Sequence, residues 1–208
     1  YRFLDPQRRI EWFPAGNFAG KVPGRDDLVL LLDLGRLDRA GSIEGPLMRN
    51  TPRLAIIAHH KPEPVAADIK AVNPDAESTG SLVYDFILNM DSANVTVDIA
   101  NAILTAMVTD TGYFRYSNTS ETTHAVASSL YHHGARVGAI RKRLESGQPF
   151  RRQKLLGLTL SNMRKSGCGR IVYSFLSRQM FDDTGALREH PEGIIDQMRI
   201  VQESMVAA

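Results

Sequence analysis

Two short apolar runs, each followed directly by side chains that can bind a metal ion, constrain the fold of this chain most strongly. LVLLLD ends at Asp33, and LAIIAHH ends at His59 and His60. Uninterrupted apolar runs of this length are typical of strands that are buried on both faces of a parallel sheet. Because the carboxyl ends of parallel strands meet at one edge, the pattern predicts that Asp33 and the histidines lie close together there. Adjacent histidines on a regular strand would point to opposite faces, so a role for both requires the chain to leave strand geometry around His59.

Helical periodicity begins after the second strand. Apolar residues three and four positions apart predict one helix that starts near Ser78, its expected cap, and runs to Met90. The same spacing from Ile99 to Val108 predicts a second helix, which brings Asp110 to its carboxyl end. The segment between the second strand and Ser78 carries three prolines, so we expect a surface loop there with at most one short extended piece.

A third helix is expected from Asn118 to Gly134. Glu121 stands three positions after Asn118 in a pattern close to a capping box, and glycine is a common helix stop. The alternation of strands and helices predicts an α/β domain with a mainly parallel sheet flanked by helices.

The rest of the chain begins as a basic segment and then changes character. Residues 136–165 look helical and contain nine Lys or Arg residues and one acid, Glu145. This imbalance would attract a polyanion if the basic side chains share a face, and it equally fits a solvated helical linker. RIVYSFL then predicts a strand, and EGIIDQMRIV predicts a helix, with a turn into another strand left open. We expect these elements to begin a second α/β domain.

The composition is that of a globular protein. The 208 residues are 43% apolar and 23% charged, which is enough apolar material for an ordinary core. No apolar run reaches the roughly 18 residues that span a bilayer, so we expect no membrane contact and a cytoplasmic location. The single cysteine, Cys168, excludes an internal disulfide and a cysteine-rich metal site.

Taken together, these motifs resemble the DHH phosphoesterase superfamily. Asp33 falls at the position of the family's second acidic motif, and His59 and His60 at the two histidines of Asp-His-His. Asp110 falls at the aspartate of the later Asp-Thr-Gly motif, and the similarity continues through AESTGSLVYDF and NTSETTHAVASSLYHHGA into the second domain. The resemblance is closest to the bacterial branch of short-oligonucleotide ribonucleases that also act as 3′,5′-bisphosphate nucleotide phosphatases.

The chain departs from the family pattern in two places. Ala58 stands where the aspartate of Asp-His-His is expected, and the family's first motif, a histidine followed by two aspartates one residue apart, is absent. Residue 1 is tyrosine and the family's glycine-rich histidine motif is not reached, so we infer a chain truncated at both ends. The resemblance then implies a DHH domain lacking its first motif over 1–135, a basic helical linker over 136–166, and part of a DHHA1-like substrate-binding domain over 167–208.

The resemblance also implies a function. It is that of a metal-dependent phosphoesterase that hydrolyses short oligonucleotides and 3′-phosphoadenosine 5′-phosphate through a metal-activated water. Asp33, His59 and Asp110 would bind metal as an incomplete ligand set. Mixed carboxylate and imidazole donors suit Mn²⁺ better than Mg²⁺. The resemblance implies two ions in the complete protein. By resemblance, His60 is catalytic and faces the substrate phosphate. Arg115 is a candidate phosphate ligand or an ordinary surface arginine, and a homodimer is left open.

Other functions stay open at this point. A cyclic-dinucleotide phosphodiesterase or a pyrophosphatase-like activity is the nearest alternative among enzymes. A catalytically impaired nucleotide-binding module is favoured by Ala58, because the loss of a carboxylate beside a ligand histidine typically weakens metal affinity or activity by about 10-fold to 100-fold. Asp33 alone is better explained as an acid that starts a turn or caps a helix, and Asp-Thr-Gly at 110–112 is also an ordinary turn sequence, so only their combination supports a metal site.

Overall fold

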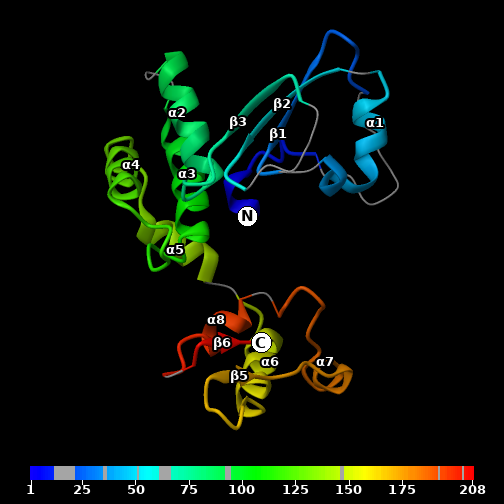
Figure 1. Cartoon of the computed structure of the whole chain (residues 1–208), viewed down its shortest axis with the longest axis vertical. Helices are drawn as coiled ribbons and strands as arrows, with labels where there is room; N and C mark the ends of the chain where they lie inside the picture. The colour runs from blue at the N-terminus through cyan, green and yellow to red at the C-terminus, as the bar shows by residue number, and fades with distance from the viewer. Residues whose placement is uncertain are drawn as a thin grey trace. The chain divides into compact units, whose positions relative to one another are not determined.

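The chain forms two units that divide, in sequence, between Leu144 and Glu145 (Figure 1). The structure is a computed structural model, and it describes residues 1–11, 22–34, 37–50, 52–60, 67–91, 95–145, 148–191, 193–202 and 204–208. The first unit carries a parallel sheet and the helices α1 to α5, and the second carries α6 to α8 and a smaller sheet.

The sheet of the first unit has three described strands. β1 (Leu28–Leu32) pairs with β2 (Arg53–Ala58), and β2 pairs with β3 (Ile69–Val72), all in parallel. The predicted α/β fold with a parallel sheet, and strands at the two apolar runs, are therefore confirmed. β3 is the short extended piece of the proline-containing segment, and residues 61–66 of that segment lie outside the described residues.

The two faces of β1 differ in burial. Val29 and Leu31 lie in an apolar cluster, whereas the three leucines that alternate with them are exposed. The prediction that both faces are buried is therefore wrong for β1, because this strand is the edge of the described sheet and only one of its faces is covered. β2, the central strand, buries every residue after Arg53. The cluster on the covered face comprises Val29, Leu31, Leu54, Ile56 and Ala58, with Leu34, Met48, Ala67 and Val72 packed against it.

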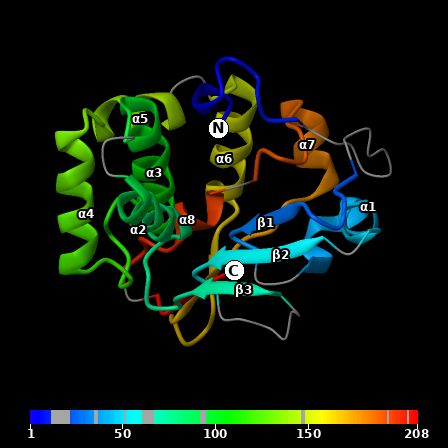
Figure 2. The ribbon, with the colours of Figure 1, turned by 90° about the horizontal axis from the view of Figure 1, so that it is seen from above.

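Most helices of the first unit gather beyond the carboxyl ends of the strands (Figure 2). A second core holds them together, and Tyr84, Leu104, Met107, Val108 and Leu130 are among its most deeply buried members. The helices in this group are α2 (Thr79–Asp91), α3 (Val97–Asp110), α4 (Glu121–His132) and α5 (Val137–Glu145). The shorter elements of the unit are η1 (Arg2–Leu4), η2 (Leu37–Ile43) and α1 (Glu44–Met48).

The caps of α2 and α4 test two predicted helix starts. Ser78 accepts a hydrogen bond from the backbone N–H of Ser81 at 3.2 Å, which confirms it as the cap of α2. α4 begins later than predicted, because its capping box is formed by Ser120 and Thr123. Asn118 is not a cap, since its side-chain amide donates to two backbone carbonyls of other segments.

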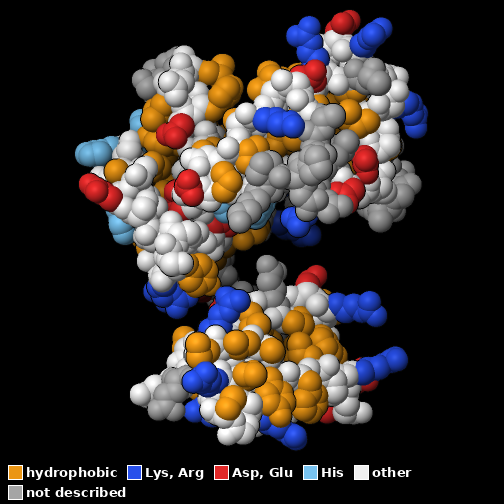
Figure 3. Space-filling view, in the orientation of Figure 1, with side chains coloured by type: hydrophobic (Ala, Val, Ile, Leu, Met, Phe, Trp, Pro, Cys, Tyr) orange, Lys and Arg blue, Asp and Glu red, His pale blue; other side chains and the backbone are white. Residues whose placement is uncertain are grey.

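The described part of the second unit combines three helices with three short strands. Leu155, Met180 and Ile194 form its buried cluster, and further apolar side chains lie on the face that Figure 3 shows. The helices are α6 (Phe150–Ser161), α7 (Arg178–Thr184) and α8 (Ile194–Met198). The strands β4 (Arg164–Lys165), β5 (Ile171–Tyr173) and β6 (Val206–Ala207) pair in the order β4-β5-β6. β5 lies within the predicted strand RIVYSFL, and α8 lies within the predicted helix EGIIDQMRIV.

The basic helical segment contributes to both units. α5 buries Ile140 in the core of the first unit, and α6 buries Leu155 in the core of the second. Each helix therefore packs into its own unit as well as carrying charge. Among the described helices, none combines the length and the apolar character that a membrane crossing requires.

α2 and α3 approach each other closely at Gly80. A Cβ atom added to this glycine would lie 2.7 Å from the Cβ of Ala106 and 3.3 Å from the carbonyl oxygen of Ile103. Carbon atoms do not approach this closely, so the absence of a side chain at Gly80 sets the spacing of the two helices. This contact lies in the first turn of α2, next to the carboxyl edge of the sheet.

We expect Gly80→Ala to destabilise the first unit by about 1–3 kcal/mol, because the added methyl group overpacks the contact between α2 and α3. Urea unfolding followed by circular dichroism measures this change. Gly138→Ala is the matched control, since a Cβ at this helical position meets no atom within 4 Å, and it should be neutral or stabilising by up to about 1 kcal/mol. Equal stabilities of the two variants would contradict the close approach.

Candidate metal centre

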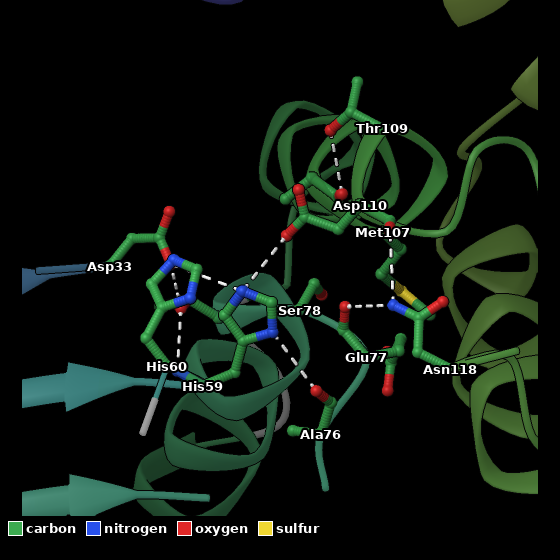
Figure 4. Close-up of polar contacts among 12 residues, drawn as sticks. Asp33, His59, His60, Ala76, Glu77, Ser78, Met107, Thr109, Asp110 and Asn118 are labelled. Carbon is green, nitrogen blue, oxygen red and sulfur yellow. Dashed lines mark hydrogen bonds and ion pairs between the residues drawn. The ribbon is translucent and has the colours of Figure 1, made fainter. Parts of the chain in front are cut away.

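Four polar side chains from distant parts of the sequence meet at the carboxyl edge of the sheet (Figure 4). Asp33 directly follows β1, His59 and His60 directly follow β2, and Asp110 is the last residue of α3. The ends of β1 and β2 are level because the backbone N–H of Asp33 donates to the carbonyl oxygen of Ile57 at 3.0 Å. The structure thus brings together the four residues that the sequence analysis selected as metal ligands or as the catalytic histidine.

The distances between these side chains are those of a shared cation site. Nε2 of His59 lies 3.6 Å from Oδ1 of Asp33 and 3.8 Å from Oδ2 of Asp110. Nε2 of His60 lies 3.4 Å from the same Asp33 oxygen. Ligand atoms on one octahedral ion with bonds of about 2.1 Å lie about 3 Å apart when adjacent and about 4 Å apart when opposite. Ligand atoms of Asp33, His59 and His60 all lie within 4.8 Å of one another, so this donor set fits a divalent ion.

The ring of His59 is oriented by the segment that precedes α2. Its Nδ1 atom lies 3.2 Å from the carbonyl oxygen of Ala76. A carbonyl oxygen only accepts, so Nδ1 carries a ring proton, and in the neutral ring Nε2 presents its lone pair toward Asp33 and Asp110. This is the arrangement in which a neutral histidine binds metal through Nε2.

The chain leaves strand geometry at the two histidines, as the sequence predicted. β2 ends at Ala58, and a bend at His59 and His60 places their ring centroids 4.5 Å apart with both rings beside Asp33. Ala58 is fully buried, and its methyl group packs in the apolar cluster with Leu54 on the covered face of the sheet.

Thr79 links Asp33 to His59 and was not among the residues that the sequence analysis selected. Its hydroxyl donates to Oδ1 of Asp33 at 2.7 Å and accepts the backbone N–H of His59 at 3.2 Å. The only signal in the sequence is its position at the start of the helix that follows the strands. The backbone carbonyl of Ala76 gives no signal at all, because every residue has one.

The backbone at the centre is strained in two places. Asp33 has a φ of 61°, and the consecutive residues Tyr113 and Phe114, just after Asp110, have φ of 60° and 64°. These are left-handed conformations, which cost non-glycine residues roughly 1–3 kcal/mol each and cluster at functional sites. The turn after α3 is held by Thr111, whose hydroxyl donates to the carbonyl of Met107 and accepts the N–H of Phe114.

Negative charge is concentrated at the end of α3. Burial raises the pKa of Asp110 above its ordinary value; Asp33 and Glu77 raise it further, and the two histidines oppose the rise. Glu77 is itself buried, with an oxygen that has no hydrogen-bond partner among the described residues. A cation would relieve this repulsion.

Arg115 makes none of its described hydrogen bonds with the four converging residues. Its Nε donates to the carbonyl of Gly112 at 2.7 Å, and the side chain is exposed.

Beside Asp33 and Asp110 lies a cleft of about 430 Å³ between β1, α2 and α3, lined mainly by apolar side chains. A ligand at the centre therefore has open space next to the carboxylates.

Two curated relatives of this chain are named as bifunctional oligoribonucleases and PAP phosphatases. The chain is 31% identical over 153 residues to the bifunctional oligoribonuclease and PAP phosphatase NrnA of Thermus thermophilus, a match that covers 73% of this chain and 44% of that protein. It is 26% identical over 179 residues to a probable bifunctional oligoribonuclease and PAP phosphatase of Streptococcus mutans, covering 83% of this chain and 56% of that protein. No protein-family model matches the sequence.

The chain is similar to members of the DHH phosphoesterase family, and it spans about half the length of the curated relatives it matches. Its fold is that of an exopolyphosphatase-related protein from Bacteroides fragilis, whose crystal structure superposes with a TM-score of 0.80 at 24% identity over 85% of this chain and 52% of that chain. The DHH family is one of hydrolases, as the names of these relatives indicate.

We expect Asp110→Asn to raise the thermal midpoint of the metal-free protein at pH 7. The raised pKa means that the folded state binds the Asp110 proton more tightly than the unfolded chain does, so stability falls as the pH rises toward the folded pKa. The asparagine variant lacks this loss. Circular dichroism melts from pH 4 to pH 7 measure the difference between variant and parent.

Asp98→Asn, in the first turn of the same helix, is the control. An acid there favours the helix dipole, so its removal should lower the midpoint slightly. A destabilised Asp110→Asn protein at pH 7 would contradict the account of charge repulsion at the centre.

Proposed function

We propose that this chain carries the catalytic centre of a metal-dependent phosphoesterase that acts on short oligonucleotides and 3′-phosphoadenosine 5′-phosphate. The observation that supports it best is the position of His59, whose Nε2 faces Asp33 at 3.6 Å and Asp110 at 3.8 Å while its Nδ1 is held by a carbonyl. The substrate class comes from the relatives, which are named as oligoribonucleases and PAP phosphatases.

Asp33, His59 and Asp110 are the proposed metal ligands. Two carboxylates and one imidazole suit Mn²⁺, with Mg²⁺ as the poorer match, and we propose two ions in the complete protein. Divalent ions at such a centre lower the pKa of bound water and neutralise the phosphoryl oxygens. Asp33 is suited to bridge two ions because it is about half exposed, and its Oδ2 takes part in none of the described hydrogen bonds.

His60 is the proposed catalytic residue. Its side chain is 47% exposed, compared with 16% for His59, so it can meet a substrate phosphate from the open side of the centre. Its Nε2 lies 3.4 Å from Oδ1 of Asp33, and an imidazole N–H at this position can donate a hydrogen bond to a phosphoryl oxygen. Arg115 is proposed as a further phosphate ligand, since a bond from Nε to Gly112 leaves the end of its guanidinium for an anion.

The larger organisation of the protein is also a proposal. We propose a DHH domain over 1–135, a basic linker over 136–166 and part of a DHHA1-like substrate-binding domain over 167–208. A cytoplasmic location and a homodimer stay predictions.

Metal binding and turnover test the function. We expect the chain to bind Mn²⁺ in isothermal titration calorimetry, and His59→Ala to weaken that binding by more than about 100-fold, since even an outer contact of a ligand is worth about 10-fold to 100-fold. In the protein at the length of its relatives, we expect Mn²⁺-dependent release of phosphate from 3′-phosphoadenosine 5′-phosphate. His132→Ala, an exposed histidine of α4, is the matched control and should change neither property. A chain that does not bind Mn²⁺ would reject the metal centre.

A catalytically impaired nucleotide-binding module is the second candidate, and Ala58 is the observation that favours it. Saturable binding of 3′-phosphoadenosine 5′-phosphate without turnover would support this module. If the missing carboxylate limits the enzyme, Ala58→Asp should raise phosphate release by about 10-fold to 100-fold. Ala58→Asn has the same size without the charge and is the control. Thermal melts of both variants are needed because Ala58 is fully buried in an apolar cluster, and equal rates in all three proteins would reject the idea.

A further inference from the structure

The side-chain amide of Asn118 donates hydrogen bonds to two backbone carbonyls beside the metal centre (Figure 4). Its Nδ2 lies 3.2 Å from the carbonyl oxygen of Glu77 and 3.1 Å from that of Asp110. Both oxygens only accept, and the amide nitrogen carries two protons, so one N–H serves each carbonyl. Because both partners are acceptors, the Asn118 side-chain atom that faces them is the amide nitrogen and not the amide oxygen.

The two carbonyls belong to the two segments that shape the centre. Glu77 directly follows Ala76, whose carbonyl holds the His59 ring. The other carbonyl is that of Asp110, the last residue of α3, where backbone carbonyls lack partners within the helix. Asn118 therefore joins the segment that orients one proposed ligand to the backbone of another.

We propose that Asn118 is a positioning residue of the metal centre, an inference that rests on the proposed function. Its amide fixes the end of α3 against the segment before α2, and so holds the Asp110 carboxylate 3.8 Å from Nε2 of His59. The last turn of a helix frays readily when its carbonyls are unbonded. Loss of the amide therefore loosens the spacing of the ligands, while the buried core of α2 to α5 keeps the fold.

Asn118→Leu tests this role, because leucine keeps the approximate shape of asparagine and donates no hydrogen bond. We expect the 208-residue chain with this change to bind Mn²⁺ about 10-fold to 100-fold more weakly in calorimetry, the usual effect of losing an outer contact of a ligand. Asn89→Leu is the matched control, since the Asn89 amide also donates to a backbone carbonyl, that of Asp85, but on the exposed surface of α2 away from the centre. Its Mn²⁺ affinity should equal that of the parent.

A second measurement needs no metal. The Nδ1 proton of His59, bonded to the Ala76 carbonyl, should exchange with water at least about 10-fold faster in metal-free Asn118→Leu than in the parent by NMR, because the segment that holds it is released. If the parent does not bind Mn²⁺, the proposed function fails, and this exchange rate alone decides the role of Asn118. Unchanged exchange together with unchanged Mn²⁺ affinity overturns the proposal. If the leucine variant does not fold, the smaller change Asn118→Ser is measured in the same way.

Discussion

The parallel pairing of β1 with β2 is the contact on which the rest of the centre depends. Leu32 lies opposite Ile57, and the N–H of Asp33 donates to the Ile57 carbonyl, so the two strands end together. A one-residue slip in this register would turn the side chains to opposite faces and separate Asp33 from the histidines. Apolar burial on β2 and on one face of β1 stabilises the register, and the register in turn positions the polar residues at the strand ends.

The centre concentrates unfavourable features that a cation would relieve. Asp33 adopts a left-handed backbone, Asp110 is held at a raised pKa, and the buried Glu77 adds negative charge nearby. The hydrogen bond from Thr79 to Asp33 and the close packing of α2 against α3 at Gly80 hold these residues in place. Strained backbone and shifted pKa values that cluster at one edge of a sheet are typical of binding and catalytic sites.

Much of this arrangement could be predicted from sequence, because it depends on periodicity. The two apolar runs predict β1 and β2, the parallel arrangement brings Asp33 and His59 together, and helical spacing brings Asp110 to the end of α3. The outer contacts could not be predicted. The carbonyl of Ala76 has no residue-specific signal, and Asn118 resembled a helix cap until its partners were known. The open face of β1 was missed because an apolar run reports hydrophobicity without saying which element covers it.

Diffraction from crystals of this chain soaked in Mn²⁺, recorded where manganese scatters anomalously, tests the central claim most directly. The account predicts anomalous density within about 2.0–2.4 Å of Nε2 of His59 and of a carboxylate oxygen of Asp33, with Asp110 close enough to complete the same site. Manganese bound elsewhere, with no density among these side chains at saturating concentration, would contradict it.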